Sequence, residues 1–313
     1  MAAMAEPFDF LTYLADPMGG ASMVIGHDEV RTLLGDGRLV VNFVEALEGL
    51  GVTEGPFHDW MAISPLDNEG DEHRRWRTLM NRTFTPGRGK QVRPFLVEEA
   101  DRLAADLARR GDVELVADFA DVLPALGLCE LIGVPAADRA HFTHLAHTVG
   151  WGFRPLQLLE HLDEVDAALT ELLAYTGGLL AARRADPLDD LVSHIATAGP
   201  EVGYSDEDCA GFLAGLVFAG NDTTRNQIGW MVGVLVERPD AWDAIGTGEW
   251  DVAASVEELM RHRSAAPVVT RRATEPVEVA GTTFEPGDHV LLSLWGADSD
   301  PAAFPDPLGV DPV

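Results

Sequence analysis

Apolar residues recur at three- and four-residue spacing along most of the chain, which is the pattern of helices with one buried face. The clearest case is residues 213–235, where Leu213 and Phe218 lead into a polar stretch and Ile228 and Leu235 continue beyond it. This spacing predicts one long buried helix. Proline and glycine fall between such segments, as at helix junctions.

The pattern changes between residues 268 and 294. Residues 277–279 alternate apolar and acidic side chains, Pro286 and Gly287 mark a turn, and residues 290–294 form a second extended run. Alternation and turn residues of this kind are typical of short strands. The sequence therefore predicts a mainly α fold with a small β-sheet region.

Composition limits the classes of function. The chain has 313 residues with 46% hydrophobic content, and no linker, repeat or low-complexity tract divides it, so we predict a single domain over residues 1–313. The formal net charge of −30 disfavours nucleic acid and anionic membrane as partners. No signal peptide is apparent and no apolar run approaches the roughly 18 residues that span a bilayer, so we expect a cytoplasmic protein.

The polar stretch inside the long helix is the first candidate site. Burying Asp222, Thr223 and Thr224 costs free energy unless each finds a hydrogen-bond partner. Gly220 weakens the helix by about 1 kcal/mol relative to Ala, and it lets a flat group lie against the backbone. The alternative is structural, because threonines commonly donate back to helix carbonyls.

Two cationic residues form a second candidate site. His73 and Arg77 are four residues apart, so on a helix they share one face and could bind a carboxylate. A solvated basic face is the alternative. Further along, Glu258 and Arg261 have the spacing of a bidentate ion pair.

These segments, in this order, resemble the cytochrome P-450 family of haem-thiolate monooxygenases. The string 219–224, Ala-Gly-Asn-Asp-Thr-Thr, is similar to the oxygen-activating helix of that family. The resemblance implies a helical fold with a small sheet, haem as cofactor, and hydroxylation of an apolar small molecule with O2. Electrons would come from a ferredoxin-type redox partner, for which arginines clustered at residues 74–93 offer a basic surface; a solvated face is equally consistent with that cluster.

The resemblance also assigns roles. It gives haem contacts to five residues, namely His73, Arg77, Ala219, Gly220 and Arg271. Arg272 is the alternative to Arg271, and a pair of strand-edge charges is the structural alternative to both. Proton delivery falls to Asp222 and Thr223, beside a substrate lying over residues 218–223. Glu258 and Arg261 become a buried structural pair with no chemistry.

The chain departs from the family at its end. The family continues from a Phe-Pro-Asp-Pro segment to a glycine-rich loop whose cysteine binds iron, whereas here only residues 308–313 follow residues 304–307. Cys129 and Cys209 stand in helical patterns typical of buried thiols, so we predict no metal ligand in this chain. We expect a fold incomplete at the C-terminus. The short N-terminal part, with a helix-like segment at residues 7–17, leaves open that the sheet is incomplete there too.

Three histidines in a helix-like stretch are a further candidate metal site. His141, His144 and His147 are spaced three apart, but no carboxylate or cysteine completes a metal site, which favours surface histidines.

A haem-free relative that binds a partner enzyme, such as a glycosyltransferase, is the alternative function. A nonfunctional remnant is a third reading.

Overall fold

The computed structural model describes residues 22–312, which form two compact units. One unit comprises Met1–Val52 and Gly233–Val313, and the other comprises Thr53–Val232. The helix-like segment 7–17 lies outside the described residues. The single domain predicted from the sequence stays a prediction.

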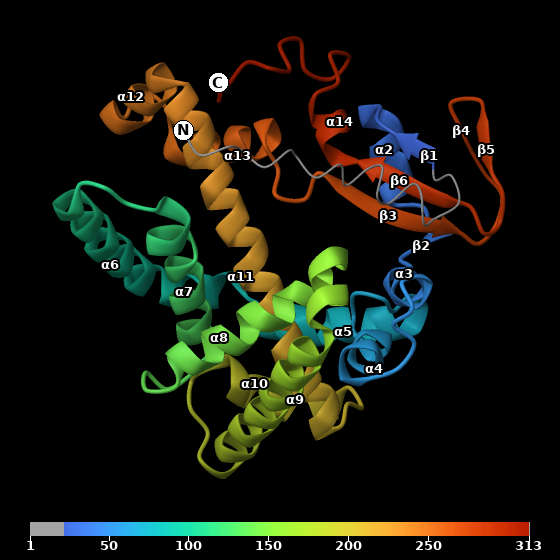
Figure 1. Cartoon of the computed structure of the whole chain (residues 1–313), viewed down its shortest axis with the longest axis vertical. Helices are drawn as coiled ribbons and strands as arrows, with labels where there is room; N and C mark the ends of the chain where they lie inside the picture. The colour runs from blue at the N-terminus through green and yellow to red at the C-terminus, as the bar shows by residue number, and fades with distance from the viewer. Residues whose placement is uncertain (1–21, 313) are drawn as a thin grey trace. The chain divides into compact units, whose positions relative to one another are not determined.

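The Thr53–Val232 unit is helical (Figure 1). A short π-helix at Val116–Ala120 and a 3₁₀ turn at Trp151–Phe153 join longer helices. These are α4 (Pro56–Ile63), α5 (Gly70–Thr83), α6 (Pro86–Arg110), α7 (Val122–Ile132), α8 (Arg139–Gly150), α9 (Pro155–Ala185), α10 (Leu191–Glu201) and α11 (Asp206–Glu237). The last of these continues past Val232 into the other unit.

Helix α9 packs against α8 and α10 and supplies much of the core of its unit. Pro155 occupies its first turn, and the helix is kinked at His161, where φ is −130° and ψ is 27°. By length and composition α9 could cross a membrane, whereas no membrane-spanning segment was expected from the sequence. Leu169, Leu172 and Leu180 are buried against the neighbouring helices, so core packing accounts for its apolar composition.

The start of α11 is capped by the side chains of Ser205 and Asp208. Ser205 Oγ accepts from the amide of Asp208 at 3.1 Å, and the Asp208 carboxylate accepts from the amide of Ser205 at 2.8 Å. This reciprocal arrangement satisfies amides that have no partner within the helix. Cys209 and Leu213 in the following turns have no exposed surface. The predicted single long helix is confirmed in extent.

The other unit carries the small sheet. Its strands are β1 (Ser22–Val24), β2 (Leu39–Val40), β3 (Val268–Ala273), β4 (Val277–Val279), β5 (Thr282–Phe284) and β6 (His289–Ser293). The first sheet has the order β1-β6-β3-β2, with β1 and β6 parallel and the other pairs antiparallel. Strands β4 and β5 form a separate hairpin, whose turn residues Ala280 and Gly281 both have positive φ. That backbone suits a tight two-residue hairpin turn.

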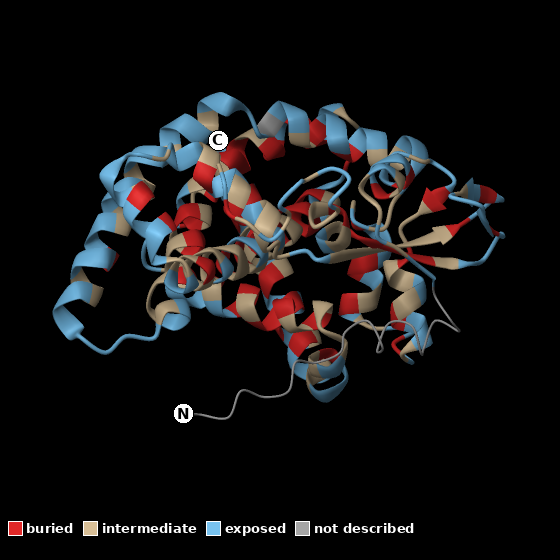
Figure 2. Cartoon of the chain, turned by 90° about the horizontal axis from the view of Figure 1, so that it is seen from above, coloured by how far each residue is buried: buried red, intermediate tan, exposed pale blue. Residues whose placement is uncertain are grey.

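The same unit contains the helices α2 (His27–Leu34), α3 (Phe43–Gly49), α12 (Pro239–Thr247), α13 (Val252–His262) and α14 (Leu294–Asp298). Val30 and Leu33 of α2 pack with Val290 and Leu292 of β6 in one apolar cluster. Figure 2 shows buried and exposed residues alternating along most helices, as one-sided packing requires. The predicted mainly α fold with a small sheet is confirmed, and strands from the N-terminal part, β1 and β2, do join the sheet.

Candidate active site

The hydroxyls of α11 are not buried, contrary to the sequence-based expectation. Thr223 and Thr224 are exposed and Asp222 is half-buried. Thr223 Oγ1 donates to the carbonyl oxygen of Ala219 at 2.8 Å, one turn earlier. Ala219 is also exposed, so a small residue and a hydroxyl form an open strip on one side of the helix. A helix surface of this kind can be covered by a flat group.

Asp222 is held by two arginines. Arg154 Nη2 and Arg225 Nη2 each donate to Asp222 Oδ1 at 2.6 Å, while Asn226 Nδ2 donates to Oδ2 at 3.2 Å. Arg225 also donates to Asp121 Oδ1 at 3.2 Å, and its own side chain is only 9% exposed. Hydrogen bonds between charged groups are roughly twice as strong as neutral ones. The carboxylate is therefore fixed in place.

His147 belongs to the surroundings of this network. Burial, followed by the nearby positive charge of Arg225, lowers the pKa of His147, although Asp121 and Asp222 act in the opposite direction. Its ring meets Trp151 edge-on at 6.0 Å. The prediction of a surface histidine is thus wrong for His147, which is half-buried, whereas His141 is exposed and pairs with Glu171 at 2.9 Å.

Gly220 has a packing role. A Cβ added at this position would lie 3.2 Å from Leu128 Cδ1 on α7, so the glycine permits close approach of the two helices. A ligand would have no room on the face of the helix where Gly220 contacts Leu128. The cofactor contact predicted for Gly220 could be made only by its main chain.

On α5, the two predicted cationic residues differ from their neighbours. Arg74 and Arg75 pair with Asp71 and Glu72 one turn earlier, so their charges are neutralised within the helix. Within residues 22–312, His73 and Arg77 show no ion pair. Arg77 is exposed and His73 is half-buried, so both remain available to an anionic group.

The basic surface expected along residues 74–93 is weaker than its arginine content suggests. Arg82 lies 3.3 Å from Glu201, and Arg88 lies 3.8 Å from Asp189. With the pairs of Arg74 and Arg75 included, acidic residues neutralise four of the six arginines between residues 74 and 93. Arg77 and Arg93 are exposed and show no acidic partner in the part of the chain that the structure describes. These contacts favour the alternative, a largely neutralised and solvated face, over a basic surface for a redox partner.

Arg271 lies on β3 in the sheet-containing unit, opposite Val290 of β6. Its Nη1 donates to the carbonyl of Thr270 at 2.8 Å. Arg272, the alternative candidate, lies 2.7 Å from Glu45 on α3. The charge of Arg272 is therefore already paired, which weighs against Arg272 as the residue that binds an anionic ligand.

The Glu258–Arg261 pair of α13 is present as predicted. Both contacts measure 2.7 Å, and the two side chains are 13% and 12% exposed. Arg261 Nη1 also donates to the carbonyls of Asp298 and Pro307, at 2.7 and 3.0 Å. Its Nη2 donates to the carbonyl of Gly309 at 3.0 Å. The pair therefore holds the segment after α14 against α13.

This pair should make stability depend on acid pH. Burial opposes ionisation of Glu258, but hydrogen bonds from Arg261 and the amide of Asp311 outweigh it and hold its pKa below the ordinary 4.5. A carboxyl with a depressed folded-state pKa contributes stability above its unfolded pKa, and this is lost as pH falls through the folded pKa. We expect the stability gap between wild type and Glu258→Gln to narrow below pH 4.5, measured by urea unfolding across pH. If the stability difference between wild type and Glu258→Gln stayed constant across pH, the ion pair would not be the source of this pH dependence.

Neither cysteine is placed to bind iron. Cys129 is 1% exposed on α7, and Cys209 is fully buried where a Cβ on Gly199 would collide with its sulfur. Burial raises the pKa of Cys129, and it raises that of Cys209 to about 11. A thiolate ligand must be deprotonated, which burial disfavours. Among the described residues there is also no group of three or more potential metal ligands.

Comparison with known proteins decides the family. Residues 252–313 match the Cytochrome P-450 family profile. Mycinamicin IV hydroxylase/epoxidase from Micromonospora griseorubida is 32% identical over 299 residues, which are 93% of this chain and 72% of that protein. The chain belongs to the cytochrome P-450 family. Luteothin monooxygenase from Streptomyces thioluteus is 30% identical over 91% of this chain and 70% of its own length.

Solved structures of the family agree with the fold. The cytochrome P-450 enzyme CxnD, for C–S bond formation in chuangxinmycin biosynthesis, superimposes with a TM-score of 0.77 and 30% identity. The alignment covers 94% of this chain and 71% of that one. As a member of this family, the protein is a haem-dependent monooxygenase by type. The open strip on α11, and the side chains of His73 and Arg77 on α5 with no acid partner among the described residues, fit the face and the anionic rim of a haem, while Cys129 and Cys209 do not fit its iron.

Proposed function

We propose that this protein oxygenates an apolar small molecule beside the Ala219/Thr223 strip of α11, and that Asp222 and Thr223 handle the protons. The observation that carries the proposal is a carboxylate fixed by Arg154 and Arg225 next to an exposed hydroxyl. A helix that only packed against its neighbours could carry apolar residues in place of Asp222 and Arg225, because burying charges costs free energy unless they are paired.

The two oxygens of Asp222 differ in availability. Oδ1 accepts from both arginines, whereas Oδ2 has only the longer 3.2 Å contact with Asn226. We therefore assign proton exchange with solvent to Oδ2. Thr223 donates its hydroxyl hydrogen to the carbonyl oxygen of Ala219, and its oxygen lone pairs can accept a hydrogen bond from a neighbouring group. Bound haem would supply the activation of dioxygen.

The apolar substrate class is supported by the residue preceding the strip. Phe218 stacks on Phe153 with ring centroids 3.6 Å apart and an interplanar angle of 5°. Val217 beside it is buried. A stacked aromatic pair at the residue before the strip suits a ligand that is mostly hydrocarbon, oriented by few polar contacts.

For the cofactor, we assign propionate contacts to His73 and Arg77 on α5, and to Arg271 on β3. The α5 assignment rests on the absence of a described acid partner for either residue. The Arg271 assignment rests on its place in the family-like strand. Electrons would come from a ferredoxin-type redox partner, whose contact we assign to exposed Arg93.

A haem titration tests the cofactor assignment on the 313-residue chain. We expect saturable but weak binding without a thiolate-type band after reduction and addition of carbon monoxide, since neither cysteine reaches iron. Arg77→Ala should weaken haem binding by about tenfold, because hydrogen bonds to charged groups are worth about 1.5–3 kcal/mol. The readout is the Soret absorbance as a function of haem concentration.

The matched control is Arg74→Ala on the same helix, whose charge is already paired with Asp71. Equal losses in the two variants would remove the propionate role of Arg77. A thiolate band would show that Cys129 or Cys209 does bind iron. A complete lack of saturable haem binding would favour the other function, a haem-free relative that acts by binding a partner enzyme.

A further inference from the structure

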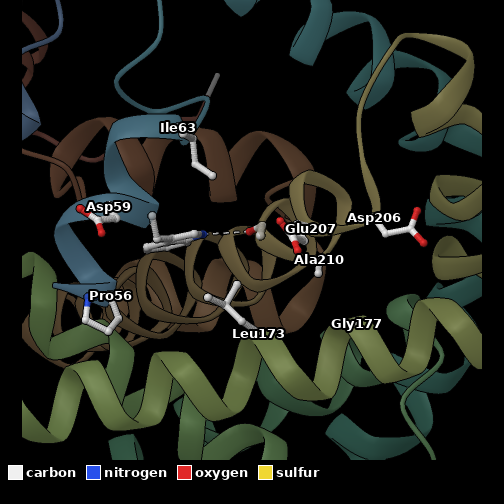
Figure 3. Close-up of a pocket in the computed structure, with 10 residues that line it drawn as sticks. Pro56, Asp59, Ile63, Leu173, Gly177, Asp206, Glu207 and Ala210 are labelled. Atoms are coloured by element: carbon white, nitrogen blue, oxygen red, sulfur yellow. Dashed lines mark hydrogen bonds between the residues drawn. The ribbon is translucent and has the colours of Figure 1, made fainter.

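A second candidate binding site lies in the Thr53–Val232 unit, away from the acid and alcohol of α11. It is a pocket of 450 Å³ between α4, α9 and the first turns of α11 (Figure 3). Pockets of about 300–1,000 Å³ are typical of small-molecule sites. Its α11 residues end at Gly211, twelve residues before Thr223, which is about 18 Å along a helix.

The floor of the pocket is apolar and rigidly held. The Trp60 ring is 4% exposed, and its Nε1 donates to the carbonyl of Gly211 at 3.0 Å. Thr176 Oγ1 donates to the carbonyl of Ala210 at 3.0 Å, which ties α9 to the same turn of α11. These hydrogen bonds cross between elements, so the pocket is preformed. At its edge, Ile63 is 52% exposed.

A glycine keeps the pocket open without a packing reason. Gly177 lies inside α9, where glycine is less favourable than alanine. A Cβ added there would meet only Ala210 Cβ, at 4.0 Å, an ordinary contact. The helix therefore has room for a larger residue at this position, and the missing side chain adds to the pocket volume.

The rim is acidic. Asp59, Asp206 and Glu207 line the pocket, and the lining includes no lysine, arginine or histidine. Asp206 is paired with Arg184, and Asp59 lies 3.1 Å from His58 Nδ1. Glu207 has no partner among the described residues and is exposed. A carboxylate without a counter-charge beside an apolar floor is complementary to an apolar cation.

We propose that this pocket binds an apolar ligand carrying a protonated amine, with the hydrocarbon against Trp60 and Leu173 and the ammonium beside Glu207. The carboxylate of Asp59 on the opposite element adds to the negative potential. The inference does not depend on haem or on the oxygenation proposed for the Thr223 strip, because the residues that form the pocket are different.

The probes are three adamantane derivatives that differ in charge: 1-adamantylamine, 1-adamantanol and adamantane-1-carboxylate. Titration calorimetry at neutral pH with the 313-residue chain and no added haem should rank the amine tightest and the carboxylate weakest. Glu207→Gln should weaken amine binding by about threefold, as for an exposed charge pair, and leave alcohol binding unchanged. Glu160→Gln, an exposed acid of α9 outside the lining, is the charge control.

The shape of the site is tested separately. Gly177→Leu should fill the pocket and weaken all binding by about tenfold or more, whereas Gly178→Leu, where an added Cβ meets open space, should not. Equal affinity for amine and alcohol would overturn the proposal. So would equal effects of the two leucine variants. If Gly177→Leu fails to fold in a melting experiment, the Glu207→Gln comparison alone decides, and an unchanged preference for the amine would reject the site.

Discussion

Replacing Glu258 by alanine should destabilise the protein by about 3–5 kcal/mol, because it leaves Arg261 largely buried without its carboxylate. The guanidinium is 12% exposed, and its remaining partners are neutral carbonyls. The cation–π contact between this guanidinium and the Phe304 ring, whose centroid is 4.8 Å away, offsets little of the loss. Urea unfolding followed by circular dichroism measures the effect.

Glu257→Ala provides the control for this experiment. Glu257 is the preceding residue of α13 and is exposed, so its removal should change stability by less than about 0.5 kcal/mol. If the two alanine variants unfold at the same urea concentration, the pair does not hold the C-terminal segment.

Asp222→Asn should slow turnover by about 100-fold, the lower end of what a positioned proton-transfer group contributes. The amide keeps the shape of the carboxylate but cannot exchange a proton, and it no longer neutralises Arg154 and Arg225. The measurement requires an iron ligand, which can be supplied by fusing residues 1–313 to the cysteine-bearing C-terminal segment of a family member. Product formation per unit time is the readout.

Thr223→Ala separates the alcohol from the acid. We expect electron consumption to continue while less of it yields product, because the hydroxyl positions a proton rather than supplying it. Thr224→Ala, an exposed hydroxyl in the next position, should leave the ratio of product to electrons unchanged. An equal ratio in wild type and Thr223→Ala would reject the role of this hydroxyl.

Local signals predicted much of the fold. The Ser205 cap and the apolar spacing after it are interactions within one segment, so the start and extent of α11 could be inferred from the chain alone. The same is true of the strands between 268 and 294 and of the i to i+3 pair in α13. In each case the partners are close in sequence, where spacing determines geometry.

Contacts between distant segments were not accessible in this way. Arg154 reaches Asp222 across 68 positions, and nothing in the residues around Arg154 marks it as a partner. Tyr204 similarly stacks on Trp76 at 3.8 Å and donates to Glu72, which attaches α5 to the start of α11. Exposure of Thr223 was also missed, because apolar spacing shows that a helix has a buried side but not where another element covers it.

The binding of three main-chain carbonyls by Arg261 has a consequence for local opening. The carbonyl of Asp298 ends α14, and those of Pro307 and Gly309 lie in the irregular stretch that follows, so each would ordinarily open independently. Since one guanidinium on α13 bonds to all of them, releasing it frees the whole stretch together with the amide of Asp311. In hydrogen exchange, residues 298–311 should therefore exchange as one cooperative unit with α13, at a rate set by the Glu258–Arg261 pair.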